Sequence, residues 1–233
     1  MIKKKTKKIL IVGAGLAGCD AAYLLAQNGC EVILVESKKI KKTPAQKLDN
    51  FAELVCTNSL KSTQLSSAHG LLKIEMQRLG SMIIDVAYDC RVPAGDALAV
   101  DRVLFSRAVS DKILNHPNIK VIHEEVVDPL DLMKRLGCGR VIIATGPLTH
   151  DSLGDWIKKT VAPNDLYFYD AIAPVVDADS LDTSKMYYKD RYRDIDDDKP
   201  ADYLNVPLNK EQYFAFIELL RNGQKVPAHN FEK

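Results

Sequence analysis

A glycine-rich turn between two apolar runs near the N-terminus constrains the fold of this sequence more than any other feature. Residues 9–12 (ILIV) are continuously apolar, as expected of a strand that a parallel sheet buries on both faces. The turn GAGLAG follows with the spacing GxGxxG, residues 20–28 have a helical pattern, and residues 31–36 form a second apolar run that ends on an acid. This order predicts a βαβ unit in an α/β, Rossmann-type domain with a parallel sheet.

Each part of this unit suits the binding of a dinucleotide. Gly13 permits a tight turn, Gly15 lets the backbone approach a pyrophosphate, and Gly18 lets the helix, whose N-terminus attracts phosphate, pack closely on the strand. Glu36 follows the turn by about 20 residues, where a carboxylate accepts hydrogen bonds from ribose hydroxyls and disfavours a 2′-phosphate. FAD or NAD therefore fits this site better than NADP. The residues expected to contact the cofactor are Gly13, Ala14, Gly15, Leu16, Ala17, Gly18 and Glu36.

A later apolar run, residues 141–144, leads into Thr145 and Gly146. In flavoproteins with two dinucleotide sites, an Ala-Thr-Gly turn commonly brings the chain back to the flavin domain. This pattern favours FAD over NAD and adds Thr145 and Gly146 to the expected cofactor-binding residues. The alternative is an ordinary buried strand followed by a turn.

Composition excludes several classes of protein. Hydrophobic residues make up 46% and charged residues 27% of the 233 residues, which is typical of a globular chain. The net charge of +1 provides no general attraction for nucleic acid, so any RNA contact requires a local patch. The five cysteines are odd in number and include no CxxC pair, which disfavours a disulfide framework and a metal site and indicates a reducing cytosol.

The N-terminus also has features of a bacterial secretion leader, with a basic start, a short apolar run and small residues before Cys19. The glycine spacing, and the helix and strand that follow it, favour a cytosolic strand and turn instead. No run reaches the roughly 18 apolar residues of a membrane span. We therefore expect a cytoplasmic protein without membrane contact.

The other apolar patterns predict core elements rather than binding surfaces. Residues 70–79 and 101–114 have helical spacing, residues 119–123 form a strand, and residues 209–223 form a late amphipathic helix that leaves an apolar face to cover. Residues 177–200 carry an acidic run and are expected to be an exposed connection. The residues of the first two helices expected to face the core are Leu71, Leu72, Met76, Leu79, Val103, Leu104, Val109 and Ile113.

Residues 38–67 form a long polar segment that starts with a cluster of lysines. Its length and its turn residues predict a functional loop beside the flavin site rather than an ordinary connection. The lysines by themselves indicate a solvated face. They are Lys38, Lys39, Lys41 and Lys42.

Several sequence motifs are together more specific than the glycine fingerprint alone. They are GAGLAG, KKTPAQKLDNFAELVCTNSLKS, GLLKIEMQRLGSMII, VPAGDALAVDR, NHPNIKVI, IIATGPLT and LYFYDAIAPVV. Together they closely resemble the TrmFO family of folate- and FAD-dependent RNA uracil-5-methyltransferases, which is more distantly related to the GidA/MnmG tRNA-modifying flavoproteins. The resemblance covers nearly the whole chain, and FAELVCTNSL and YFYDAIAPVV are much more specific than the glycine fingerprint.

The resemblance implies a reaction and a catalytic residue. FAD, reduced by NADH or NADPH, would pass a one-carbon unit from 5,10-methylenetetrahydrofolate to C5 of a uridine in RNA, in the T-loop of tRNA or in ribosomal RNA. Cys56 matches the catalytic cysteine of the family motif ELVC(S/T)NS, where a thiolate acts as a nucleophile or assists removal of the C5 proton. A lone cysteine is otherwise more often a small buried residue. That interpretation is kept for Cys19, Cys30, Cys90 and Cys138.

The sequence departs from the family pattern at two points. Asp96 stands where the family usually has a second glycine, which could alter the loop near the flavin. Family members also continue through a second cysteine and back into the flavin domain, whereas this sequence ends at Lys233. We therefore expect either a fragment of an active enzyme or a truncated product that needs a homodimer or another chain to complete its flavin site.

We expect a FAD-binding domain over residues 1–122 and an incomplete inserted α+β domain, on the substrate and RNA side, over residues 123–233. Two alternatives to the methyltransferase stay open, a non-catalytic module that binds RNA or a partner and another FAD-dependent oxidoreductase, because fold does not set function. A cluster of aromatic and basic residues could stack RNA bases and contact phosphates, or pack in the core. Its members are Tyr167, Phe168, Tyr169, Tyr187, Tyr188, Arg191, Tyr192 and Arg193.

Overall fold

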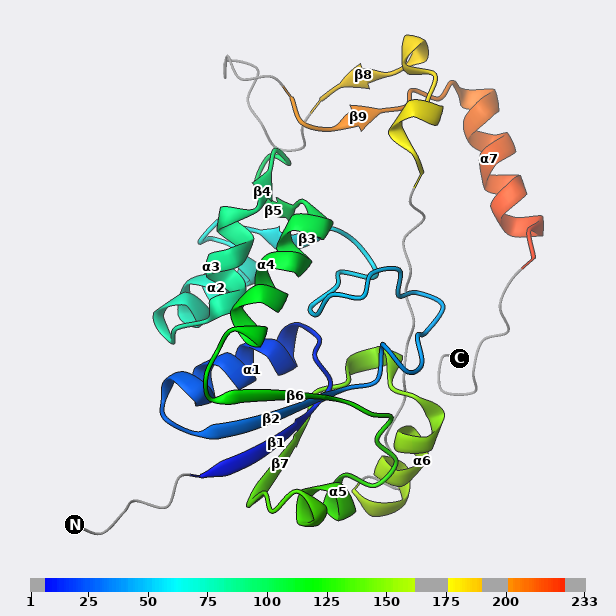
Figure 1. Ribbon diagram of the computed structural model, residues 1–233. Helices are drawn as coiled ribbons and strands as arrows, with labels where there is room; N and C mark the ends of the chain where they lie inside the picture. Colours follow the sequence, from blue (N-terminus) through cyan, green and yellow to red (C-terminus); the bar gives the residue numbers. More distant parts are fainter. Residues whose placement is uncertain (1–6, 162–175, 190–200, 225–233) are drawn as a thin grey trace. The chain divides into compact units, whose positions relative to one another are not determined.

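The computed structural model describes residues 7–161, 176–189 and 201–224. The chain divides into two compact units, Met1–Val175 and Val176–Lys233 (Figure 1). This division differs from the expected boundary after residue 122. The physical reason is that β7 (Arg140–Ile143) pairs in parallel with β1 (Lys8–Val12), so the segment beyond residue 122 supplies a strand of the first unit's sheet.

A four-stranded parallel sheet forms the centre of the first unit. Its strands are β1, β2 (Glu31–Glu36), β6 (Ile119–His123) and β7, in the order β6-β2-β1-β7. In the register, Leu10 of β1 lies between Ile33 of β2 and Val141 of β7. With α1 (Leu16–Gln27) crossing from β1 to β2, this is the 3-2-1-4 strand order of a Rossmann-type sheet. The expected α/β class with a parallel sheet is confirmed.

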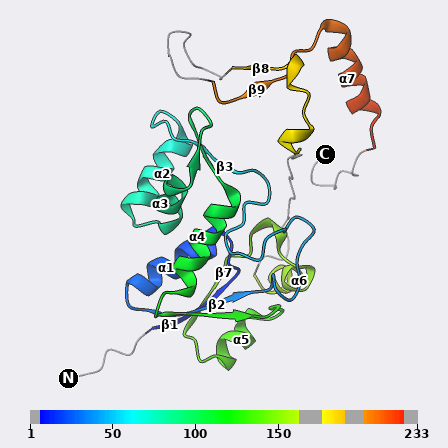
Figure 2. The same ribbon diagram turned by 45° about the horizontal axis from the view of Figure 1, so that its top comes forward.

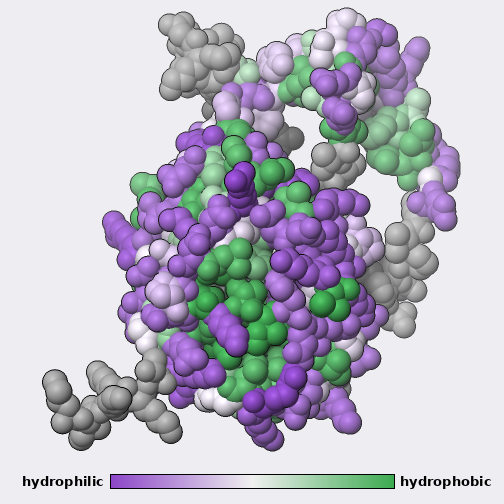
Figure 3. All heavy atoms as spheres, viewed as in Figure 1, coloured by the Kyte–Doolittle hydropathy of each residue, from purple (hydrophilic) through white to green (hydrophobic). Residues whose placement is uncertain are grey.

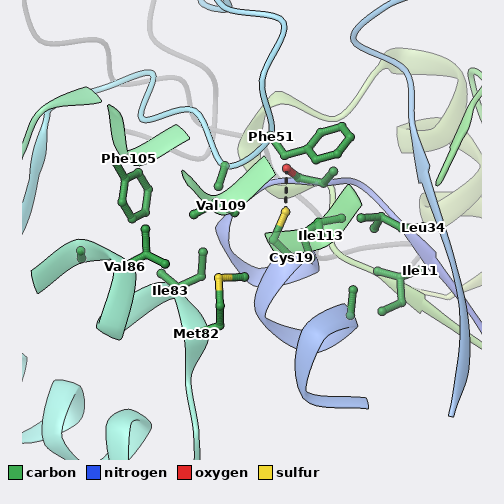
Figure 4. Close-up of a cluster of buried hydrophobic side chains, with 14 of the residues drawn as sticks. Ile11, Cys19, Leu34, Phe51, Met82, Ile83, Val86, Phe105, Val109 and Ile113 are labelled. Carbon is green, nitrogen blue, oxygen red and sulfur yellow. Dashed lines mark hydrogen bonds between the residues drawn. The ribbon is translucent and has the colours of Figure 1, made fainter. Parts of the chain in front are cut away.

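Helices cover both faces of this sheet (Figures 1 and 2). Alternate strand residues point to opposite faces, so Ile11 and Leu34 belong to one core and Leu10 and Ile33 to the other. The first core is closed by α1, α3 (Met82–Asp89) and α4 (Arg102–Leu114), and the second by α5 (Pro129–Arg135) and α6 (Asp151–Thr160). Figure 4 shows the first core, where side chains of these helices and strands gather around Phe51 and Phe105.

A small antiparallel sheet, which the sequence patterns did not predict, lies in the same unit. It contains β3 (Ser59–Ser62), β4 (Arg91–Val92) and β5 (Ala97–Val100) in the order β3-β5-β4. Helix α2 (Ala68–Arg78) follows β3. Strands of two to four residues are too short to show an alternating pattern.

The faces predicted for two helices are partly wrong. In α2, Leu71, Leu72 and Leu79 are exposed, and the helix instead buries Gly70 and Lys73. Backbone contacts select this face, because a Cβ at Gly70 would lie 1.9 Å from a carbonyl oxygen of the preceding loop, and the Lys73 ammonium donates to two backbone carbonyls. In α4, Val109 and Ile113 are buried as expected and are joined by Phe105. Val103 and Leu104 are exposed.

The second unit contains a short hairpin and the predicted late helix. Strands β8 (Tyr187–Tyr188) and β9 (Leu204–Asn205) pair antiparallel, and α7 (Lys210–Asn222) starts at a capping box formed by Asn209 and Gln212. No residue of α7 is buried, and its apolar side chains gather on the surface (Figure 3). Of the predicted aromatic cluster, Tyr187 and Tyr188 are exposed. Tyr167, Phe168, Tyr169, Arg191, Tyr192 and Arg193, and most of the acidic run, lie outside the described residues.

The short 3₁₀ turns are η1 (Gly146–Leu148), η2 (Ala178–Ser180) and η3 (Thr183–Lys185). No helix within the described ranges combines the length and the apolar character that a membrane crossing requires.

Candidate functional site

A cavity of about 330 Å³ lies at the carboxyl ends of β1, β2 and β7, where open α/β sheets bind their ligands. Most residues predicted from the sequence to bind the cofactor line it together. They are Gly13, Ala14, Gly15, Leu16, Ala17, Glu36, Thr145 and Gly146. Gly18 and Cys56 are not among the lining residues, although Val55, which precedes Cys56, is.

The glycines of the turn act in different ways. Gly13 has a φ of +98°, and a Cβ there would lie 2.7 Å from the carbonyl oxygen of Ala144. A Cβ at Gly18 would lie 1.8 Å from the carbonyl oxygen of Gly13, so Gly18 is required for packing the helix against the turn. Gly15 has no atom within 4 Å of such a Cβ, so its backbone is uncovered at the cavity. This division of roles is the one predicted for a turn that approaches a pyrophosphate.

The N-terminus of α1 is also suited to bind an anion. Gly15 is the N-cap residue and provides no side-chain acceptor for the first N–H groups of the helix. Those N–H groups carry the positive end of the helix dipole. A phosphate is a suitable partner for them.

Glu36 lies buried at the end of β2 and accepts two backbone hydrogen bonds. Its Oε2 accepts from the N–H of Ala14 at 2.7 Å, and its Oε1 accepts from the N–H of Lys38 at 2.8 Å. A carboxylate has about four acceptor positions, so two of them stay available for hydroxyl donors. The arrangement fits a ribose, and with the open turn it fits the adenosine diphosphate half of a dinucleotide.

Lys38 corrects the expectation that the lysine cluster is solvated. Its Nζ donates to Glu53 Oε2 at 2.9 Å and to the carbonyl oxygen of Asn50 at 2.6 Å, and the two charged side chains are only 5% and 2% exposed. Lys41 and Lys42 behave as expected of a surface, because they pair with Glu125 and Asp49 and are 52% and 38% exposed. The cluster therefore contains one buried structural lysine.

Glu53 is held by further hydrogen bonds. Its Oε1 accepts from the N–H groups of Lys47 and Leu48 at 2.8 and 3.0 Å. Burial raises the pKa of this carboxyl, but the bonds from the Lys47 N–H, the Lys38 ammonium and the Leu48 N–H together outweigh it. The pKa of Glu53 is therefore below its ordinary value of 4.5, and the carboxylate form is favoured.

The two residues before Glu53 are anchored as well. Ser110 Oγ accepts from the N–H of Phe51 at 2.8 Å, and Ser106 Oγ donates to the Phe51 carbonyl at 2.5 Å. The N–H of Ala52 donates to the carbonyl of Ala14 at 2.9 Å, which ties this segment to the glycine turn. Phe51, Ala52 and Glu53 are thus fixed to three different parts of the unit, and Glu53 lies three residues before Cys56.

Cys56 is half-buried in the segment between Glu53 and β3. Two non-glycine residues with positive φ flank it, Ala52 at 50° and Lys61 at 69°, and these are the non-glycine positions with positive φ in the described part of the chain. Such backbone strain is common at functional sites. Cys56 directly follows Val55, which lines the cavity, and is not itself a lining residue.

Burial affects the thiols of three other cysteines, Cys19, Cys90 and Cys138. The Cys19 thiol is buried and donates to the carbonyl of Ala14 at 3.3 Å (Figure 4), and burial strongly raises its pKa. Burial also raises the pKa of Cys90 and of Cys138. The thiolate form is disfavoured at all three positions.

Asp96 lies on the turn between β4 and β5 and does not line the cavity. It does not have a positive φ, so this position does not require the glycine that the family pattern has. Its carboxylate accepts a hydrogen bond from Gln64 Nε2 at 2.6 Å. The turn accommodates the aspartate without strain.

Sequence reasoning missed several residues of the cavity. Ser37 Oγ lies 3.1 Å from His150 Nε2, and both line the cavity together with Thr43 and Gln46. Ser37, Thr43 and Gln46 follow the carboxyl end of β2, and this position was the signal that could have identified them. Among the described residues, no group of three or more His, Cys, Asp or Glu side chains is placed to hold a metal ion.

Comparison with known proteins adds a family and its relatives. The sequence profile of the family described as "Glucose inhibited division protein A" matches residues 8–233. Proteins named "Methylenetetrahydrofolate--tRNA-(uracil-5-)-methyltransferase TrmFO" from Streptococcus pneumoniae, among them those of strains ATCC 700669 / Spain 23F-1 and D39 / NCTC 7466, are 47% identical over 226 residues. The match covers 97% of this chain and 48% of each relative, so the chain spans about half the length of these curated relatives.

Solved structures give weaker similarities. The Y270F mutant of MHPCO is 18% identical and has a TM-score of 0.32, with 54% of this chain and 34% of that chain covered. The tetrameric form of 2-methyl-3-hydroxypyridine-5-carboxylic acid oxygenase is 20% identical, with the same TM-score and coverage.

Proposed function

Because the chain belongs to the glucose inhibited division protein A family, we propose that it is the FAD-binding part of a methylenetetrahydrofolate-dependent RNA uracil-5-methyltransferase. The observation that carries this proposal is the 47% identity to the TrmFO proteins over 97% of the chain. The geometry of the cavity supports it independently, because the glycine turn and Glu36 are arranged for a dinucleotide.

The residues around the cavity suit FAD. Gly13, Gly15 and the first N–H groups of α1 would hold the pyrophosphate, and Glu36 would accept the ribose hydroxyls. Thr145 and Gly146 reach the same cavity from the end of β7. FAD, when bound and kept reduced by NADH or NADPH, supplies the electrons that turn the one-carbon unit of 5,10-methylenetetrahydrofolate into a methyl group.

Cys56 would act on the uracil. C5 of uracil is a weak nucleophile until a group adds at C6, and the C5 proton has to leave before the methylated ring is restored. A thiolate at Cys56 would serve as the nucleophile or assist that proton removal. The anchoring of Phe51, Ala52 and Glu53 would hold the thiol at a fixed place beside the cavity.

The substrate would be RNA. The names of the relatives specify tRNA. The reaction requires NAD(P)H, folate and RNA in one compartment, which is the cytoplasm.

The test uses this chain alone and a chimera in which the C-terminal half of the Streptococcus pneumoniae relative follows it. FAD binding is measured by flavin fluorescence, and 5-methyluridine is measured in a tRNA transcript supplied with FAD, NADH and methylenetetrahydrofolate. Cys56→Ala should bind FAD as the wild type does and form no 5-methyluridine. Cys90→Ala, a control at another half-buried cysteine, should keep both properties.

The other outcomes separate the alternatives. A wild-type chain that does not bind FAD contradicts the proposal as a whole, and an active Cys56→Ala variant removes Cys56 from the mechanism. FAD binding without methyl transfer in either form favours a non-catalytic module. Oxidation of NAD(P)H on a small substrate, independent of RNA, favours another FAD-dependent oxidoreductase.

A further inference from the structure

The connection between β7 and α6 crosses the cavity and forms one of its walls. Strand β1 lies between β2 and β7 in the sheet. Residues 144–150 leave the end of β7 and reach the end of β2, because His150 Nε2 lies 3.1 Å from Ser37 Oγ. On this path the connection passes the glycine turn, where the Ala144 carbonyl oxygen would lie 2.7 Å from a Cβ at Gly13. Residues of the whole connection, including His150, line the cavity.

His150 begins α6, but its side chain does not cap the helix. It is the N-cap residue, and it forms no side-chain cap hydrogen bond. Helices prefer Ser, Thr, Asp or Asn at this position, because those side chains accept from the first N–H groups. The imidazole pairs with Ser37 instead. The position therefore carries a ring at the cavity wall in place of a stabilising helix cap.

The start of α6, which carries this ring, is tied to two other segments. Ser152 Oγ, in the first turn of the helix, donates to Glu125 Oε1 at 3.1 Å. The same oxygen accepts from Lys41 Nζ at 2.9 Å. These bonds join α6 to the segment after β6 and to the loop after β2. Together with the Ser37 contact, they hold His150 in place without a ligand.

The His150 ring keeps a polar edge and accessible surface for a ligand. His150 is half-buried and lines the cavity. Nε2 pairs with Ser37, whereas Nδ1 has no hydrogen bond to any residue in the described part of the chain and is not among its buried unpartnered atoms. Each imidazole nitrogen donates or accepts according to the tautomer, and the Ser37 hydroxyl can pair with either form. The ring can therefore donate to a ligand or accept from it.

The order of the sites along the sheet indicates which part of a dinucleotide lies nearest to this ring. The glycine turn at the end of β1 suits the phosphates, and Glu36 at the end of β2 suits the ribose. In an adenosine diphosphate unit the ribose lies between the phosphates and the base, so the base extends beyond Glu36, away from the glycine turn. Ser37 follows Glu36 directly, and it is the residue that holds His150.

We propose that His150 contacts the adenine base of the bound dinucleotide and that Ser37 is the residue that positions its ring. This inference rests on the proposed function, since it takes the cavity to be a dinucleotide site. The contact is a hydrogen bond or stacking on the base, both of which an imidazole provides.

The test is calorimetric titration of the 233-residue chain with FAD and ADP, together with the thermal midpoint of each variant without ligand. His150→Ser removes the ring and supplies a side chain that an N-cap position favours. It should bind FAD and ADP about fivefold more weakly, because a contact with the ligand is lost. Its midpoint should stay equal or rise. His69→Ala, a control at an exposed histidine outside the cavity, should bind both ligands as the wild type does.

Two further comparisons test the base contact and the role of Ser37. UDP carries the same ribose and phosphates with a smaller base, so His150→Ser should weaken ADP binding more than UDP binding. Ser37→Ala should weaken ADP binding in the wild-type background and have no further effect in His150→Ser, since Ser37 acts through the ring.

Equal affinity of His150→Ser and wild type for FAD and ADP overturns the role of His150 and leaves the dinucleotide site intact. A lower midpoint together with weaker binding also overturns it, because that pattern indicates a structural role. An equal loss for ADP and UDP overturns the base contact, and additive effects of the two substitutions overturn the positioning by Ser37. A wild-type chain that binds neither FAD nor ADP overturns the dinucleotide site itself.

Discussion

The buried ion pair between Lys38 and Glu53 makes a quantitative prediction about stability. At 2.9 Å the attraction is about 6 kcal/mol with an effective dielectric constant of about 20, before the cost of desolvation. Removing one partner leaves the other charge buried, and such changes cost about 3–5 kcal/mol. Lys38→Met should therefore lower the free energy of unfolding by about that amount, and it also leaves the Asn50 carbonyl without its lysine donor.

A double-mutant cycle separates this pair from general loss of packing. Urea unfolding of wild type, Lys38→Met, Glu53→Gln and the double variant should give a coupling energy of about 2–3 kcal/mol. The matched control is the pair of Lys41 and Glu125, whose 2.9 Å contact is 52% and 27% exposed and should give about 0.2–1 kcal/mol. A coupling for Lys38 and Glu53 no larger than that of the control would refute the argument that burial makes this pair strong.

Three further predictions concern Glu53, the glycine turn and Lys61. The pKa of Glu53 is lowered in the folded protein, so the stability that its carboxylate contributes is fully present above pH 4.5 and is lost as the pH falls through the folded-state pKa. The stability difference between wild type and Glu53→Gln should therefore shrink in acid unfolding curves below about pH 4.5. A difference that is independent of pH would contradict this. Gly15→Ala should fold normally and lose FAD binding, whereas Gly18→Ala should fail to fold. Thermal unfolding measures the first property and flavin fluorescence the second. Equal stability of the two variants would contradict the requirement for glycine at position 18 in the packing of α1 against the turn. Lys61→Gly should raise the free energy of urea unfolding by up to about 1 kcal/mol by relieving a φ of 69°, while Arg107→Gly inside α4 should lower it by about 1 kcal/mol.

The sequence predicted the parts of the fold whose pattern is local and continuous. The apolar run 31–36 coincides with β2, and residues 119–123 coincide with β6, because buried parallel strands carry uninterrupted apolar residues. The faces of α2 were not predictable, since Gly70 and Lys73 are buried by contacts with backbone carbonyls rather than by hydrophobicity. The strands β3, β4 and β5 were too short to leave a pattern.

The candidate site likewise combines residues that the sequence could predict with residues that it could not. The glycine turn and Glu36 could be predicted because their chemistry depends on spacing along the chain. The pairing of Lys38 with Glu53 could not, because a lysine in a polar run normally indicates solvent and its partner lies 15 residues away in a loop. Its burial results from tertiary contacts, such as the two serines of α4 that hold Phe51.

The most direct test of the account is an equilibrium titration of this chain with FAD, followed by flavin fluorescence, beside a parallel titration with NADP⁺. We expect saturable binding of one FAD per chain, no comparable binding of NADP⁺ at this site, and loss of FAD binding in Gly15→Ala without loss of fold. A folded wild-type chain that does not bind FAD, or one that binds NADP⁺ as tightly, would contradict it.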